Sequence, residues 1–144
     1  MKKLVIIFLV LIVGQSMVSQ EKINEFAFEY EAVSRGFYQK IEVNKDTFVF
    51  IEDRAGKKNS QGKISNKQWK KIVALVNKIK LKQLSSLKAP SENRKFDGAA
   101  HAKLKVLYKD DIFESSSFDH GNPPVEIKTL VEYIINISKS VNKT

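Results

Sequence analysis

The hydrophobic pattern of this chain changes from a strand period to a helical period twice, and this constrains the fold more than any other feature. Residues 26–32 alternate large apolar side chains with small or acidic ones, and residues 37–43 and 47–52 alternate around the turn signal Asn44-Lys45-Asp46. A period of two residues places one face of a strand in the core and the other in water. The first part of the chain therefore predicts a strand followed by a hairpin.

The period then becomes helical after a polar stretch. Residues 54–63 contain Gly56 and Gly62 and are predicted to form a loop. Ser65 and Gln68 fit a capping box, which satisfies free N–H groups at a helix start. We expect this helix to end near Lys80 and an irregular segment with Leu81, Leu84 and Leu87 to follow. The apolar stripe of the helix consists of Trp69, Ile72, Val73, Val76 and Ile79.

The second half of the chain repeats this plan. Residues 102–108 and 112–118 read as strands around the predicted three-residue loop Lys109-Asp110-Asp111. Asn122 is a suitable N-cap, and Pro123 suits the first helical turn, where its missing N–H costs nothing. The stripe of this second helix consists of Ile127, Leu130, Val131, Ile134, Ile137 and Val141.

These elements predict an α+β fold. The expected architecture is an antiparallel sheet built from two ββα units, with the two helices packed on one face and residues 26–32 added at an edge. The turns at residues 44–46 and 109–111 occupy matching places in the two units, as do Phe48 and Phe113. We interpret the two units as a duplication.

The N-terminal residues resemble a secretory signal peptide. Lys2 and Lys3 precede an unbroken apolar run from Leu4 to Val13, and small residues up to Ser19 follow. The run is shorter than the roughly 20 apolar residues of a membrane-spanning helix, so we predict cleavage after Ser19 and no transmembrane segment in the mature protein. Residues 20–144 then form a single exported domain, periplasmic or secreted; a retained N-terminal anchor is the alternative. The chain has no cysteine, which excludes disulfides, thiol catalysis and cysteine metal sites.

A resemblance follows from the segment Ser34-Arg35-Gly36-Phe37, the capped helix and the repeated plan. Together they resemble a group of small exported bacterial proteins of unknown function. The architecture is also similar to that of β-lactamase-inhibitor-like proteins, duplicated strand–helix modules that bind other proteins. The resemblance implies a binding role and carries over no catalytic residue, and the disulfides of the inhibitor class are absent here.

Both histidines of the chain lie at the open end of the second predicted hairpin. With the predicted loop, His101 stands opposite Asp119 and next to His120, and Asp97 lies just upstream. Imidazole and carboxylate groups are suitable zinc ligands. The simpler interpretation is that Asp97 belongs to a turn and that residues 119–122 end a strand and cap a helix, because no spacing signature such as His-Glu-x-x-His is present.

Cations define two further candidate surfaces. Arg35 and Arg94 lie in predicted loops, where a guanidinium group can bind a carboxylate or phosphate, or pair with Glu29 or Asp97. Between Arg54 and Lys95 the chain has thirteen Lys or Arg and one acid, Glu92. Five lysines share the side of the first helix opposite Trp69: Lys67, Lys70, Lys71, Lys78 and Lys82. In an exported protein this face is expected to attract anionic glycan, lipid or protein surfaces rather than nucleic acid, or it is a solvated face. No aromatic residues interleave the lysines, which argues against a platform that stacks single-stranded bases.

The sequence favours a non-enzymatic function. Ser115-Ser116-Ser117 lies near His120, but the strand-to-helix elbow of a serine nucleophile is absent. The leading hypothesis is an exported protein-binding module of the bacterial envelope, inhibitor- or immunity-like, with no cofactor. The alternatives are a metal site at His101, His120, Asp97 and Asp119, and adhesion of the lysine face to an anionic envelope polymer.

Overall fold

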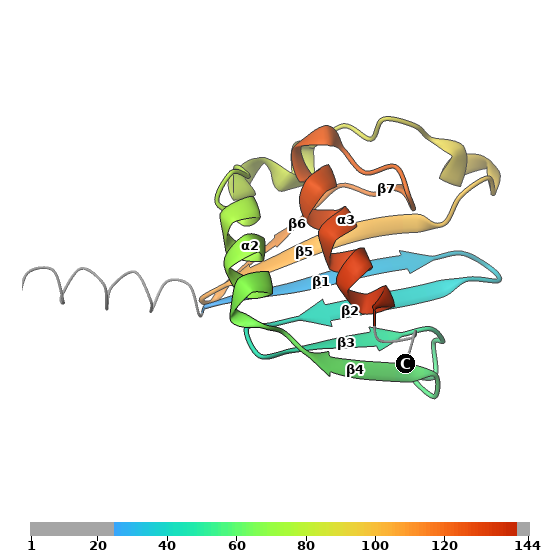
Figure 1. Ribbon diagram of the computed structural model, residues 1–144. Helices are drawn as coiled ribbons and strands as arrows, with labels where there is room; N and C mark the ends of the chain where they lie inside the picture. The colour runs from blue at the N-terminus through green and yellow to red at the C-terminus, as the bar shows by residue number, and fades with distance from the viewer. Residues whose placement is uncertain (1–24, 141–144) are drawn as a thin grey trace, which may run out of the picture.

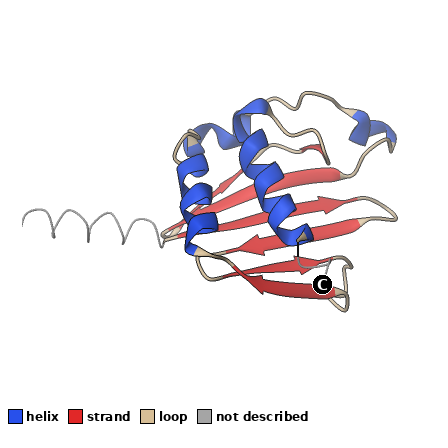
Figure 2. Ribbon diagram, viewed as in Figure 1, coloured by secondary structure: helices blue, strands red, loops and turns tan. Residues whose placement is uncertain are grey.

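A seven-stranded antiparallel sheet runs through the protein, and its two long helices lie side by side on one face (Figures 1 and 2). The computed structural model describes residues 25–140, so the predicted signal peptide, residues 1–19, lies outside the described residues. The strands are β1 (Phe26–Val33), β2 (Tyr38–Val43), β3 (Thr47–Ile51), β4 (Asn59–Lys63), β5 (His101–Tyr108), β6 (Asp111–Glu114) and β7 (Phe118–Asp119). The helices are α2 (Asn66–Val76) and α3 (Val125–Lys139), with 3₁₀ turns η1 (Leu81–Ser86) and η2 (Asn93–Phe96) between α2 and β5. The predicted α+β class and the antiparallel sheet are confirmed.

The position of β1 corrects the predicted topology. The strand order is β4-β3-β2-β1-β5-β6, with β7 also paired to β5, so β1 is central and not at an edge. It pairs with β2 on one side and with β5 on the other. An alternating pattern reports that one face of a strand is buried, and it carries no information about how many neighbours the strand has. The edge position therefore did not follow from the pattern.

The predicted loop over residues 54–63 is wrong at its C-terminal end. Asn59–Lys63 forms β4, the edge strand that pairs with β3. Its side chains are polar because an edge strand is stabilised by backbone hydrogen bonds to a single neighbour and is largely exposed. The amino-acid composition of residues 59–63 is therefore like that of a loop.

The second hairpin has a different turn from the one predicted, yet the expected pairing of His101 with Asp119 is confirmed. Tyr108 pairs with Asp111, not with Ile112, so the connection contains two residues instead of three. The strand is then interrupted after Glu114, and β7 resumes the pairing with β5 in a register shifted by one residue. The extra residue in the interruption compensates for the shorter turn. Ser115 bridges the break, because its N–H donates to the Leu104 carbonyl (2.9 Å) and its Oγ accepts from the Leu104 N–H (3.0 Å).

Helix α2 begins as predicted and ends earlier. The Ser65 Oγ accepts from the Gln68 N–H and the Gln68 Oε1 accepts from the Ser65 N–H, so the capping box is confirmed. The helix ends at Val76 rather than near Lys80, and η1 buries Leu84 in the predicted irregular segment.

Helix α3 begins two residues later than an Asn122 N-cap requires. Pro124 occupies the cap position, without a side-chain cap. The residue before a proline is driven out of the helical region, so Pro123 cannot start the helix when Pro124 follows it. Asn122 instead donates from Nδ2 to the Ser91 Oγ at 2.8 Å.

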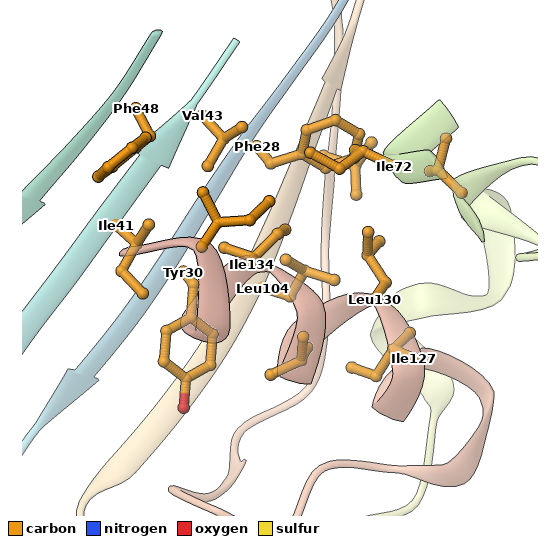
Figure 3. Close-up of a cluster of buried hydrophobic side chains, with 14 of the residues drawn as sticks. Phe28, Tyr30, Ile41, Val43, Phe48, Ile72, Leu104, Ile127, Leu130 and Ile134 are labelled. Atoms are coloured by element: carbon orange, nitrogen blue, oxygen red, sulfur yellow. The ribbon is translucent and has the colours of Figure 1, made fainter. Parts of the chain in front are cut away.

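The core lies between the sheet and the two helices (Figure 3). Phe28 and Tyr30 of β1 and Leu104 of β5 lie in one buried cluster with Ile72 of α2 and Leu130 of α3. Full burial of each such side chain contributes about 1.5–3 kcal/mol. Trp69 packs edge-on against Phe28 with ring centroids 6.0 Å apart. This core sets the position of every loop at the sheet ends.

The other face of the sheet carries ion pairs and is not covered by a helix of the described chain (Figure 1). Glu29 lies between Lys40 (3.1 Å) and Lys105 (3.0 Å), and Glu114 pairs with Lys103 at 2.6 Å. Within residues 25–140, no helix is long and apolar enough to cross a membrane.

Candidate functional site

Four connections that are far apart in the sequence meet at one end of the sheet. Val33 at the end of β1 pairs with His101 at the start of β5, so the β1–β2 turn lies beside the segment that leads into β5. The β3–β4 loop reaches the same end, because Ile51 at the end of β3 pairs with Asn59 at the start of β4. We call this end, at the right of Figure 1, the loop end. It consists of residues 34–37, 52–58, 91–100 and 119–124. Recognition residues are commonly carried on such loops, held in place by a rigid scaffold.

A buried carboxylate anchors the longest of these loops. Asp119 is 2% exposed, and its Oδ1 accepts from the Arg94 N–H (3.1 Å) and from the Arg94 Nη1 (3.0 Å). Its Oδ2 accepts from the Ser91 hydroxyl (2.6 Å) and from the Asn93 N–H (2.8 Å). Arg94 is also buried and donates from Nη1 to the Ser91 carbonyl at 2.7 Å. The loop from residue 91 to residue 96 is therefore fixed to the sheet by a charge-assisted network.

This network favours the ionised form of the Asp119 carboxyl. Burial by itself raises the pKa of the Asp119 carboxyl, but the hydrogen bonds from Ser91, from Arg94 and from the Asn93 N–H outweigh it and hold the pKa well below the ordinary value of 3.8. Asp119 is thus an ionised structural group whose oxygens are already engaged by donors of this chain.

The anchored loop presents an aromatic side chain to solvent. Phe96 ends η2 and is 84% exposed. Asp97 follows with a left-handed backbone (φ 56°), and the Gly98 N–H donates to the Asn93 carbonyl at 2.9 Å. A Cβ at Gly98 would lie 3.2 Å from both the Asn93 Cβ and its carbonyl oxygen. The turn is closed by its own backbone, so Phe96 projects from a defined conformation.

His120 lies beside the β1–β2 turn. Its Nδ1 is 2.7 Å from the hydroxyl of the buried Tyr30, and its ring centroid is 5.1 Å from that of Phe37. Burial and the charge of Lys139 lower the pKa of His120, and burial raises that of the Tyr30 hydroxyl. The neutral imidazole is therefore favoured, hydrogen-bonded on one side and covered on another by the half-exposed Phe37.

Arg35 lies at the tip of the β1–β2 turn. It is exposed and lines a hollow of about 250 Å³ with Phe37, Tyr38, Glu52 and Arg54, among others. Arg54 closes one side of this hollow, because its Nη2 donates to the Ser34 carbonyl at 2.8 Å. Arg35 is thus available to a partner, whereas Arg94 is buried against Asp119.

The structure brings some of the predicted metal ligands close in the fold without forming a metal-binding group. His101 pairs with Asp119 and is exposed, while His120 is turned toward Tyr30. Asp97 lies exposed in the turn after Phe96. Among residues 25–140 there is no group of three His, Cys, Asp or Glu side chains placed to hold a metal ion.

The lysines of the predicted basic face are all exposed: Lys67, Lys70, Lys71, Lys78 and Lys82. Their predicted placement on a single helix is wrong for two of them, because α2 ends at Val76: Lys78 lies in the turn that follows the helix and Lys82 in η1. Lys71 lies over the ring of Tyr133 in α3, with its Nζ 4.4 Å from the ring centroid. This contact joins the two helices at the surface, and the cation–π interaction contributes about 0.5–1 kcal/mol at such a site.

Sequence reasoning missed Phe96 as a site residue and the hydrogen bond between Tyr30 and His120. The signal for Phe96 is a single aromatic residue in a charged segment, between Lys95 and Asp97. No sequence pattern connects Tyr30 with His120, because only the pairing of β1 with β5 brings them together.

Comparison with known proteins provides no family for this chain. No protein-family model matches it, and a search of the curated proteins finds no match.

Proposed function

We propose that this protein is an exported, non-enzymatic protein-binding module of the bacterial envelope, inhibitor- or immunity-like, and that the loop end contacts the partner protein. The observation that carries the proposal is Phe96, an aromatic side chain that is 84% exposed on a loop anchored by the buried pair of Arg94 and Asp119. Full burial of a phenylalanine contributes about 1.5–3 kcal/mol. The fold does not use this energy, so it is available for binding.

Rigidity strengthens this argument. Ordering a flexible loop on binding costs free energy, and a loop that is already ordered avoids that cost. Arg35 and Phe37 lie on another connection of the same end, and arginine and aromatic residues are enriched at interface cores and hot spots. The loop end therefore offers two exposed aromatic side chains and a free guanidinium group on one scaffold.

The acid–base groups near this end support a non-enzymatic role. The Asp119 oxygens accept from four donors of this chain, and the His120 Nδ1 is paired with the Tyr30 hydroxyl. Ser115, which lies outside the loop end, takes part in the hydrogen bonding between strands. Each of these groups has a structural role that accounts for its position.

The test is site-specific photo-crosslinking in cells that produce the full chain. A photoreactive phenylalanine analogue replaces Phe96 in one variant and Ile112 in the other. Ile112 is the matched control because it is 67% exposed but lies at the opposite end of the sheet, beside the β5–β6 turn.

We expect the Phe96 probe to give a discrete crosslinked protein that the Ile112 probe does not. F96A should lose that partner in a pull-down, and I112A should retain it. Identical crosslinking patterns from the two positions, or a partner that F96A still recovers with unchanged affinity, would refute the loop end as the recognition surface.

Export and duplication are part of the proposal. We propose that residues 1–19 are a signal peptide, which N-terminal sequencing of exported protein tests: the mature chain should begin at Gln20. We also propose that the two predicted ββα units, β2-β3-α2 and β5-β6-α3, descend from one duplicated segment, with a further strand, β4 or β7, before the helix of each. The same order of elements in both segments supports this.

A further inference from the structure

Within residues 25–140, lysines on the open face of the sheet form ion pairs, whereas lysines around α2 do not. On the open face of the sheet, Lys40, Lys103 and Lys105 are each within 4 Å of a glutamate. None of the ion pairs within residues 25–140 involves Lys67 or Lys70 of α2, and the same holds for Lys78 and Lys82, which follow the helix. The charge of the sheet face is locally neutralised, whereas that of the α2 side is not.

The segment around α2 contains lysine as its only charged residue type. From residue 55 to residue 91 the chain has neither arginine nor an acidic residue, and the lysines of β4 and its loop, such as Lys58 and Lys63, extend the same field. Lysine is a compact point charge on a flexible stem and does not form the planar fork that arginine uses for bidentate recognition. Such a surface suits a ligand that carries many anions in variable positions.

We propose that the α2 side is a second binding surface, for an anionic glycan chain. We name it the lysine surface; it consists of Lys67, Lys70 and Lys71 of α2 together with Lys78 and Lys82 of the segment that follows the helix. An amphipathic helix that lies on a bilayer buries its apolar face in the interface, and electrostatic attraction to anionic lipids adds to this binding. The apolar stripe of α2 is instead buried in the core: Trp69, Ile72, Val73 and Val76. The surface therefore offers charge without an inserting face, which favours a soluble polyanion over a membrane.

The inference does not depend on the proposed function, because the lysine surface and Phe96 lie on different elements. Loss of the protein partner in F96A should leave glycan binding unchanged. Each proposal can therefore fail while the other holds.

The experiment measures binding of the purified mature protein to polygalacturonate, a carboxylate polymer, at 50 and 200 mM salt. If about four lysines neutralise polymer charges, and the polymer has the charge density of a single nucleic-acid strand, counterion release predicts roughly a 50-fold loss of affinity over this range. The test variant is K67E/K70E. Lys67 lies in the first turn of α2, where an acidic residue is favourable with the helix dipole, so folding is preserved.

The control variant is K109E/K128E, which changes the net charge by the same amount. Lys109 lies in the β5–β6 turn and Lys128 on α3, and both are about half exposed. We expect K67E/K70E to lose binding by an order of magnitude or more, and the control to lose much less.

Three outcomes would overturn the proposal. They are equal losses in the two variants, binding that does not weaken at 200 mM salt, and binding to vesicles containing phosphatidylglycerol without binding to the polymer.

Discussion

Replacement of Asp119 by asparagine tests whether the loop end is held by a buried ion pair. The variant keeps the size of the side chain and removes its charge. Arg94 is then left buried without a counter-charge, and the amide group faces some of the donors that the carboxylate accepted from. Breaking a buried pair in this way costs about 3–5 kcal/mol. We expect about 3 kcal/mol, the lower end of that range, because the cover is a single loop that can open to hydrate Arg94.

Thermal and urea unfolding of the purified protein measure this loss. For a domain of this size, 1 kcal/mol shifts Tm by about 4 °C, so D119N should melt about 12 °C lower than the wild type. The control is D53N. Asp53 also accepts backbone N–H groups, from Lys57 and Lys58, but in the β3–β4 loop at the surface, so its loss should be much smaller.

The pH dependence provides an independent check. Because the folded-state pKa of Asp119 lies below its ordinary value of 3.8, its contribution to stability is present above about pH 4 and is lost as the pH falls. The difference in stability between the wild type and D119N should therefore narrow from pH 5 to pH 2.

Two results would refute this reasoning. One is a stability loss in D119N no larger than that in D53N. The other is a difference between D119N and the wild type that stays constant from pH 5 to pH 2. The double variant R94M/D119N should recover part of the loss, since it removes the buried charge altogether.

Three further predictions concern single positions. G98A should lose about 1 kcal/mol because the new Cβ meets Asn93 at 3.2 Å, whereas G36A, with open space around it, should be neutral or slightly more stable; urea midpoints compare the two. S65A should lose about 1 kcal/mol in the same assay, because the hydroxyl caps α2, and an unchanged midpoint would contradict this role. NMR titration should give His120 a pKa below the ordinary 6.5. Because the folded-state pKa is lowered, protonation of His120 should reduce the stability of the protein as the pH falls below about 6.5. H120Q should flatten the dependence of stability on pH in this range.

Most of the fold could be predicted because the elements are amphipathic. Strands β1, β2, β3 and β5 and both helices bury one face each, and their periods of 2 and 3.6 are visible in the residue order. The errors lie where side-chain pattern carries no information. Edge strand β4 is held by backbone hydrogen bonds, and the start of α3 is decided by the steric effect of Pro124 on Pro123.

The candidate site was predicted in part. The pairing of His101 with Asp119 follows from counting residues along a hairpin, and the count succeeded because the interruption around Ser115 compensates for the shorter turn. The partner of Asp119 could not be predicted from local sequence. Arg94 reaches it across a 25-residue separation, through the fold of the loop before β5.

The sequence by itself determined which face of the amphipathic strands and helices is buried and where the excess of positive charge lies, because both depend only on residue type and spacing. The tertiary structure alone decided that β1 is central, that Asp119 is a structural anchor and that Phe96 projects into solvent. These properties depend on which strands and loops become neighbours. That choice follows from the packing of the whole core and is not contained in any single segment.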